Sequence, residues 1–150
     1  MRVLVQRVLE AQVSVSGETI GSISSGLLLL VGFCDGDGLE ELNWMARKIA
    51  GLRVFSDDDD QMNLSIQETN GEILAVSQFT LYGDCRKGRR PSFVSALDPL
   101  EANNLFESFV AELSEQGIST VEKGRFGEHM EVQLINDGPV TLWLNKEPVS

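Results

Sequence analysis

The sequence predicts one α+β domain with a strongly curved, barrel-like β-sheet and two main helices. Three observations support this prediction. Apolar segments of strand length recur along the chain, two longer segments carry apolar residues at helical spacing, and no repeat, linker or low-complexity stretch divides the chain. A length of 150 residues also suits one domain with its own core. We therefore expect a single domain over residues 1–150, and the number of strands suggests that the sheet is curved.

The first half of the chain predicts three strands and a helix. Residues 2–8 and 12–16 alternate between apolar and polar side chains, which predicts two strands joined by a short turn near Glu10. Residues 26–33 form an apolar run with the length of a buried strand. A helix follows, because apolar residues recur at helical spacing before a glycine. These residues are Leu42, Met45, Ala46, Ile49 and Gly51.

The second half predicts a further buried strand, a second helix and a strand-rich end. Residues 53–55 suit a short strand, residues 56–72 a polar loop, and residues 72–83 a buried strand. The second helix starts with Asp98 as its N-cap and Pro99 at its first position, and a glycine follows its end. Its inner stripe consists of Leu105, Phe106, Phe109, Val110 and Leu113.

Composition and charge limit the possible locations and partners. No apolar run is long enough to span a bilayer and the first residues lack a signal-peptide layout, so we expect a cytoplasmic protein with no membrane partner. The net charge of −11 argues against a nucleic-acid partner. However, four of the six residues 85–90 are cationic, and such a loop can still bind one end of a nucleic-acid strand. Cys34 and Cys85 could form a disulfide, although two free thiols fit this compartment better.

Most familiar catalytic patterns are missing. The chain has one histidine, His129, and we expect it on the exposed face of a strand, opposite Met130 and Val132, rather than in a catalytic triad. No Cys and His cluster has zinc-binding spacing, and residues 57–60 suit a solvated turn better than a metal site. We therefore expect neither a metal nor a cofactor.

Two stretches remain as candidate functional segments. Ser77, Gln78 and Thr80 come at the end of a predicted apolar strand, just before the basic loop. They are either strand-end hydroxyl and amide groups that bind the backbone, or the wall of a pocket in which main-chain N–H groups face a reacting carbonyl. The second stretch, residues 134–145, reads as a strand interrupted by Gly138 and Pro139. From the residues alone, a hairpin turn with a trans peptide bond is the simpler reading.

The two stretches resemble the signatures of the D-aminoacyl-tRNA deacylase family. The signatures are Ser-Gln-Phe-Thr-Leu, here residues 77–81, and Asn-Asp-Gly-Pro-Val-Thr, here residues 136–141. Further similar segments occur in the same order over the whole chain, at residues 6–8, 55–65, 90–93 and 124–134. The resemblance implies a homodimer that hydrolyses the ester between a D-amino acid and the 3′-terminal ribose of tRNA. We also expect it to accept glycine, which has no side chain for a chirality filter to reject.

The resemblance also implies roles for individual residues. Catalysis would involve Ser77, Gln78, Phe79 and Thr80. Gly138 and Pro139, joined by a cis peptide bond, would reach into the partner's pocket as a backbone filter for chirality. The residues that support the pocket would be Arg7, Phe126, Met130 and Asn136. Since a charge among apolar strand residues needs a partner, we expect Arg7 to brace the Gly-Pro segment. The residues that bind tRNA phosphates would be Arg86, Lys87, Arg89 and Arg90.

Two mechanisms and two other functions stay open. Backbone N–H groups near Phe79 and Thr80 could stabilise the oxyanion while water attacks with help from the ribose hydroxyl. Alternatively, Thr80 could be a nucleophile, although no adjacent base is evident. The other functions are an unrelated serine or threonine esterase built on Ser77 or Thr80, and a non-enzymatic RNA-binding module, which would need exposed stacking aromatic residues.

Overall fold

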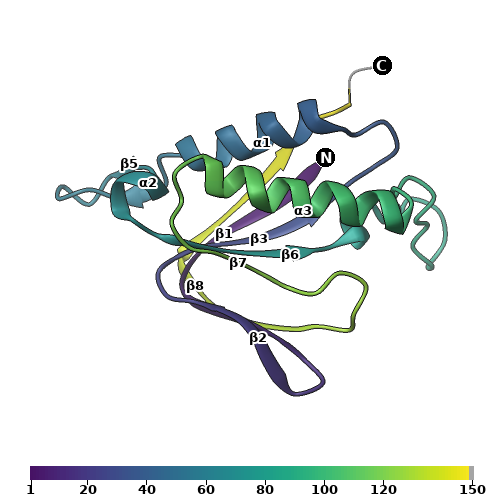
Figure 1. The fold of residues 1–150 in the computed structure, drawn as a ribbon, viewed down its shortest axis with the longest axis horizontal. Coiled ribbons are helices and arrows are strands. Elements are labelled where there is room, and N and C mark those ends of the chain that lie inside the picture. Colours follow the sequence, from purple (N-terminus) through teal and green to yellow (C-terminus); the bar gives the residue numbers. More distant parts are fainter. Residues whose placement is uncertain (149–150) are drawn as a thin grey trace.

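The computed structural model describes residues 1–148, and its main feature is a curved six-stranded sheet (Figure 1). The strands follow the order β2-β1-β3-β6-β7, and β8 pairs with β1. Their bounds are β1 Arg2–Val15, β2 Glu18–Ile23, β3 Gly26–Gly32, β6 Glu72–Ser77, β7 Val121–Lys123 and β8 Glu131–Asn145. The sheet is nearly closed and barrel-like within one domain, as the sequence predicted.

The long strand β1 holds the sheet together. Its first half pairs with β3, its second half pairs with β2, and β8 runs antiparallel along it from Arg2 opposite Asn145 to Ser14 opposite Glu131. Strand β6 lies parallel to both β3 and β7. Because β1 changes its partner along its length, the sheet curls around instead of extending flat.

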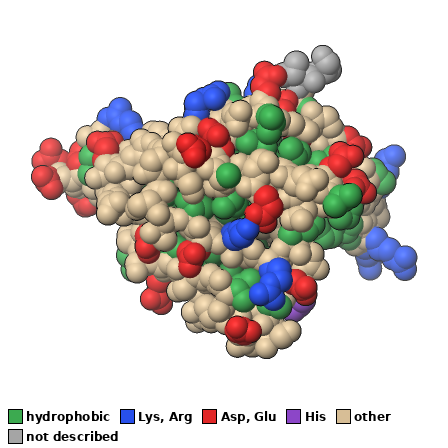
Figure 2. Space-filling view, in the orientation of Figure 1, with side chains coloured by type: hydrophobic (Ala, Val, Ile, Leu, Met, Phe, Trp, Pro, Cys, Tyr) green, Lys and Arg blue, Asp and Glu red, His purple; other side chains and the backbone are tan. Residues whose placement is uncertain are grey.

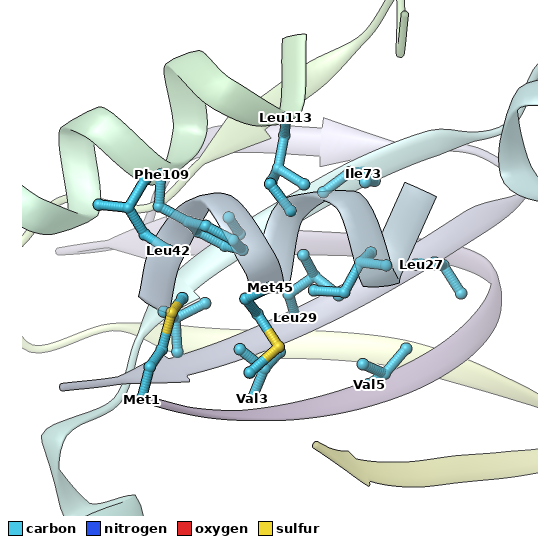
Figure 3. Close-up of a cluster of buried hydrophobic side chains, with 14 of the residues drawn as sticks. Met1, Val3, Val5, Leu27, Leu29, Leu42, Met45, Ile73, Phe109 and Leu113 are labelled. Atoms are coloured by element: carbon cyan, nitrogen blue, oxygen red, sulfur yellow. The ribbon is translucent and has the colours of Figure 1, made fainter. Parts of the chain in front are cut away.

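Two long helices cover one face of the sheet (Figure 1). They are α1 (Leu39–Gly51) and α3 (Pro99–Glu115), which cross the same face and enclose the main core with β1, β3 and β6. Figure 3 shows side chains of Leu42, Met45 and Phe109 from the helices packed above Val3 and Leu29 of the strands. A second apolar cluster fills the other face, beneath the curl of the sheet.

Capping groups fix where the helices begin. The Asp98 carboxylate accepts the N–H of Leu100 at 3.2 Å, and Pro99 is the first helical residue, as the sequence predicted for α3. In α1, the Glu41 carboxylate accepts the N–H of Gly38 at 2.9 Å. The start of α3 borders the candidate site, so its cap also positions part of that site.

The predicted turn near Glu10 is wrong, because β1 continues through this position. The alternation of buried and less buried residues is interrupted at Val8 and Leu9, and the pairing with β8 shifts register on both sides of Val8. An interruption within one strand resembles the end of one strand and the start of another. The sequence pattern therefore indicated an irregularity that is real but is not a turn.

Two predictions in the middle of the chain also need correction. The strand expected over residues 72–83 ends at Ser77, and a 3₁₀ helix, η1 (Phe79–Tyr82), follows it. The segment expected as a loop contains strand β5 (Met62–Leu64) and helix α2 (Ile66–Thr69), and β5 pairs with β4 (Phe55–Ser56). Among the described residues, no helix is long and apolar enough to cross a membrane.

Candidate active site

A pocket of about 580 Å³ opens where four segments meet at one end of the sheet. Residues 31–33 and 76–79 come from the ends of β3 and β6, and residues 93–102 come from the approach to α3 and its first turn. Residues 126–132, which join β7 to β8, form the opposite wall. The volume falls in the range of small-molecule sites, and the end of a parallel strand pair is a common place for one.

Gly32 allows the chain after β6 to pass close to the end of β3. A Cβ atom on Gly32 would lie 2.9 Å from the carbonyl oxygen of Gln78 and 3.3 Å from Leu81. The N–H of Gln78 donates to the Val31 carbonyl at 2.7 Å, which extends the β3–β6 pairing by one residue. The sequence reasoning missed Gly32, although a glycine at the end of a buried strand is a signal for close backbone approach.

Three of the four residues from Ser77 to Thr80 line the pocket. Ser77, Gln78 and Phe79 line it, whereas Thr80 is exposed beside it. Phe79 and Thr80 belong to η1 and not to the end of a strand, which corrects the prediction for these two residues. The N–H groups of Phe79 and Thr80 open this 3₁₀ helix and therefore have no acceptor within it. The Thr80 hydroxyl accepts a hydrogen bond from the Gln78 side-chain amide.

Aromatic side chains stand at one side of the pocket. The rings of Phe79 and Phe93 meet edge to face with their centroids 5.1 Å apart, and both line the pocket. Phe79 is 56% exposed, so an aromatic surface faces solvent at the entrance. Across the pocket, Phe126 and Met130 line the wall, and Phe126 packs on Phe106 of the core, so both predicted supporting residues lie at the site.

His129 does not lie on a strand, which corrects the sequence prediction. The segment from Gly124 to Met130 is a loop that precedes β8, and both Glu128 and His129 line the pocket from it. The polar and apolar residues around His129, Met130 and Val132 alternate as in a strand, so the sequence pattern predicted a strand where the chain forms a loop. No signal in the sequence placed the two ionisable residues at the pocket wall.

The basic loop forms a small hairpin beside the pocket. Asp84 and Ser92 exchange two backbone hydrogen bonds, of 2.7 and 2.9 Å, which close the loop at its base. Arg86 contacts both oxygens of the Asp84 carboxylate, at 2.9 and 2.8 Å, and this guanidinium lowers the pKa of Asp84 to about 2. Of the four predicted phosphate-binding residues, Arg86 is therefore already paired, whereas no ion pair within residues 1–148 involves Lys87, Arg89 or Arg90.

Acidic side chains lie over the whole of one face of the molecule (Figure 2). Figure 2 shows a group of them at the end that carries α2 and β5, and it shows Lys and Arg side chains among the charged groups at the opposite end, where the loop between η1 and α3 lies. The overall charge of −11 thus does not describe the surface around the pocket, where an anionic ligand can approach cations.

The Asn136–Thr141 segment is a bulge within β8, so the hairpin reading is wrong. Gln6 pairs with Thr141 and Val8 pairs with Asn136, which leaves residues 137–140 opposite Arg7 alone. The Gly138–Pro139 peptide bond is cis, and Gly138 has a φ of +124°, in a region that favours glycine. Gly138 and Pro139 are exposed, and neither lines the pocket of their own chain.

Two side chains hold the bulge in place. The Arg7 Nε atom donates to the Asp137 carbonyl at 3.2 Å and lies 3.3 Å from the Asp137 carboxylate, and Nη1 donates to the Val54 carbonyl at 2.6 Å. The side-chain Oδ1 of Asn136 accepts the N–H of Val140 at 3.2 Å, and its Nδ2 donates to the Thr141 hydroxyl at 2.9 Å. The structural partner expected for Arg7 is thus the segment that contains Gly138 and Pro139. Asn136 braces the bulge and is not at the pocket.

A cluster under η1 ties it to β1. The Arg2 guanidinium lies 4.3 Å from the centre of the Tyr82 ring and donates to the Leu81 carbonyl at 2.9 Å. Burial raises the pKa of Tyr82 and of the nearby Cys34 thiol, so both groups stay protonated at neutral pH. Cys34 and Cys85 are free thiols, the first buried and the second exposed. No group of His, Cys, Asp and Glu residues in the described part of the chain is arranged to hold a metal ion.

Comparison with known proteins gives a consistent result. A model of the family described as D-Tyr-tRNA(Tyr) deacylase matches residues 4–145. A protein of Exiguobacterium sibiricum named D-aminoacyl-tRNA deacylase is 58% identical over 97% of this chain and 100% of its own length. A protein of the same name from Thermotoga petrophila is 53% identical over 97% of each chain.

Solved structures agree on the fold. A structure titled c-Myc DNA Unwinding Element Binding Protein has a TM-score of 0.93 and 39% identity, covering 98% of this chain and 99% of its own. A structure titled as a probable eukaryotic D-amino acid tRNA deacylase has a TM-score of 0.81 and 19% identity, covering 95% and 97%. At that identity, the second structure supports the fold alone.

Proposed function

We propose, since the chain belongs to the D-Tyr-tRNA(Tyr) deacylase family, that it is a D-aminoacyl-tRNA deacylase. It hydrolyses the ester between a D-amino acid and the 3′-terminal ribose of tRNA and releases both products. The observation that carries this proposal is the pocket, whose wall contains the Ser77–Phe79 segment and whose edge carries a basic loop. Such a pocket suits the aminoacyl end of a polyanionic substrate.

The terminal nucleoside finds suitable surfaces at the pocket entrance. Phe79 and Phe93 present aromatic faces and edges to which an unpaired base can stack, a contact worth about 1–3 kcal/mol per base. The unpaired cations Lys87, Arg89 and Arg90 follow within the same connection, where they meet the phosphates of the last nucleotides. The aromatic side chains at the pocket thus position the terminal base, and the cations beyond the pocket bind the phosphates.

The chemical step uses backbone groups rather than a nucleophilic side chain. Water attacks the ester carbonyl carbon, and the N–H groups of Phe79 and Thr80 stabilise the negative charge that develops on the carbonyl oxygen. Each such donor contributes about 3–4 kcal/mol to transition-state stabilisation. The bond to the ribose oxygen then breaks, the neighbouring ribose hydroxyl assists the proton transfer, and the free amino acid leaves.

The alternative in which Thr80 is a nucleophile is disfavoured by its surroundings. A threonine hydroxyl needs an adjacent base to become nucleophilic. The partner of the Thr80 hydroxyl is the side-chain amide of Gln78, which donates a proton and accepts none at its nitrogen. An unrelated esterase built on this residue would face the same difficulty.

Selection for D-residues comes from a second copy of the chain. The Gly138–Pro139 segment is exposed and braced by Arg7 and Asn136, yet it lies outside its own pocket. In a homodimer it enters the partner's pocket, where its carbonyl groups stand against the α-carbon of the substrate. An L-residue would direct its side chain into these carbonyls and is rejected, whereas glycine has no side chain to reject. Trp143, 50% exposed on β8, supplies apolar surface for such an interface.

The test is hydrolysis of three substrates on the same tRNA by the purified protein: D-tyrosyl, L-tyrosyl and glycyl esters. The D-tyrosyl and glycyl esters are hydrolysed and the L-tyrosyl ester is spared. Resistance of glycyl-tRNA equal to that of the L-ester would show that the filter does more than reject side chains. Resistance of all three esters would exclude the proposed function.

A further inference from the structure

The loop before β8 brings an unpaired acidic side chain to the entrance of the pocket. Gly127 has a φ of +81°, and the N–H of Glu128 donates to the Arg125 carbonyl at 3.3 Å, so the chain turns at this point. Glu128 and His129 then line the pocket wall. Because Glu128 is exposed as well as lining the pocket, it stands at the mouth and not at the floor.

The Glu128 carboxylate has no protein partner within residues 1–148. None of the ion pairs or side-chain hydrogen bonds among these residues involves it. The other carboxylate at the pocket, Asp98, differs because it accepts the N–H of Leu100 as the cap of α3. A carboxylate without a partner has its full charge available to whatever enters the mouth.

No cation lines the same pocket to balance this charge. The titratable side chains in its lining are Asp98, Glu128 and His129, and the lining contains neither lysine nor arginine. The cations of residues 86–90 lie in the loop beyond Phe79, outside the pocket wall. The mouth is therefore acidic, although its surroundings on one side are basic.

We propose that Glu128 makes the pocket sensitive to the charge of the amino acid, so that D-aminoacyl groups with anionic side chains are hydrolysed more slowly than neutral or cationic ones. This inference rests on the proposed function. Because an L-residue would direct its side chain into the filter, a D-residue directs its side chain the other way, toward the mouth of the pocket. The α-ammonium is common to all substrates, so the contrast between substrates arises from the side chain alone. The chirality filter ignores side-chain identity, and Glu128 adds a graded preference to it.

The size of the effect follows from the exposure of the group. Two unit charges about 4 Å apart interact by about 1 kcal/mol in a water-like dielectric, which corresponds to a factor of about five in rate. We therefore expect kcat/KM for D-glutamyl esters to be about fivefold below that for D-glutaminyl esters of nearly equal shape. We expect kcat/KM for D-lysyl esters to equal or exceed kcat/KM for D-glutaminyl esters. Salt reduces the contrast, because the charges are exposed.

The experiment measures kcat/KM for D-glutamyl, D-glutaminyl and D-lysyl esters of one tRNA with three proteins: the unaltered protein, Glu128→Gln and Glu115→Gln. Glu115 ends α3, is exposed and lies outside the pocket lining, so its replacement makes the same change in net charge at a distant place. In Glu128→Gln, kcat/KM for the D-glutamyl ester rises toward kcat/KM for the D-glutaminyl ester. In Glu115→Gln, the fivefold contrast persists.

The possible outcomes separate this inference from the proposed function. An unchanged contrast in Glu128→Gln overturns the role of Glu128, as does an equal loss of rate for all three esters, which would make it a general part of the catalytic machinery. A preference for the D-glutamyl ester in the unaltered protein would also overturn it. Failure to hydrolyse any D-aminoacyl ester would instead exclude the proposed function.

Discussion

At the scale of single residues, the site depends on groups whose partners the fold fixes. Arg7 is 9% exposed and joins β1 to both the β8 bulge and the carbonyl of Val54. Thr80, by contrast, is exposed, and its hydroxyl accepts a hydrogen bond from the neighbouring Gln78 amide. The Arg7 side chain therefore supports the structure around the site, whereas the Thr80 side chain supports no distant segment.

Replacing Thr80 by valine separates the two mechanisms. If the backbone N–H at this position is the functional group, single-turnover hydrolysis of D-tyrosyl-tRNA by Thr80→Val stays within about threefold of the unaltered rate, since the substitution keeps the N–H. Thr120→Val, outside the pocket, is the matched control. A loss of several orders of magnitude would instead support a nucleophilic hydroxyl.

Replacing Arg7 by methionine tests the brace. The substitution leaves the buried Val54 carbonyl without its donor and the Asp137 carboxylate without its cation, so we expect the free energy of unfolding to fall by about 2–4 kcal/mol. Because the bulge is then held less firmly, hydrolysis of the L-tyrosyl ester should increase relative to the D-tyrosyl ester. Urea denaturation and the two rates provide the measurements.

The control is Arg47→Met on the exposed side of α1, which removes the same charge without breaking an ion pair within residues 1–148. It should leave stability within about 0.5 kcal/mol. Equal effects of the two substitutions would refute a specific brace at Arg7.

At the scale of elements, periodic segments could be predicted and irregular ones could not. Helices α1 and α3 and strand β3 follow from apolar spacing and from capping residues such as Asp98. The continuity of β1 depends on its pairing with a distant bulge in β8, and the start of η1 depends on close packing against Gly32. Neither cause is local in sequence. Helix α2 is an exception, because Ser65 and Glu68 form a capping box that the sequence does display.

The basic loop offers a contrast between paired and unpaired cations. Arg86 is engaged by Asp84, whereas Arg89 is not in an ion pair within the described chain. We expect Arg89→Ala to weaken tRNA binding and to lower the slope of log K against log salt by about 0.7–0.9 for each phosphate that the protein no longer neutralises. We expect Arg86→Ala to have a smaller effect, because the Arg86 guanidinium is already paired with the Asp84 carboxylate and has fewer N–H groups left for a phosphate.

The pKa of Asp84 determines how the difference in tRNA binding between Arg89→Ala and Arg86→Ala depends on pH. Its folded pKa of about 2 lies below the ordinary carboxyl value, so the pair stabilises the loop above the unfolded pKa and is lost only as the pH falls toward about 2. The difference between the two variants should thus be the same at about pH 6 and about pH 8. Equal salt slopes for both variants would contradict the assignment of Arg89 to phosphate.

At the scale of the whole molecule, the pocket unites segments that are far apart in sequence. The motif residues Ser77, Gln78 and Phe79 could be chosen from the sequence, and so could Phe126 and Met130 through the family resemblance. The presence of residues 127–129 at the pocket could not be predicted from the sequence, because it depends on where the loop before β8 crosses the open end of the sheet. Residues 137–139 are braced on the opposite edge of β1 from β3, away from the pocket of their own chain, and this position supports the proposal that a second copy completes the site.

The most direct test of this account is complementation between two inactive variants. Ala102→Phe fills the pocket but keeps the filter segment, whereas Gly138→Leu keeps the pocket but places a bulky side chain on the filter. Thermal unfolding first verifies that each variant folds. A dimer with one copy of each, isolated through two affinity tags, contains one site in which both parts are intact. It should recover about half of the D-tyrosyl-tRNA hydrolysis of the unaltered protein and spare the L-ester, as expected if one of two independent sites is restored. A mixed dimer as inactive as its two parents would contradict a site shared between copies.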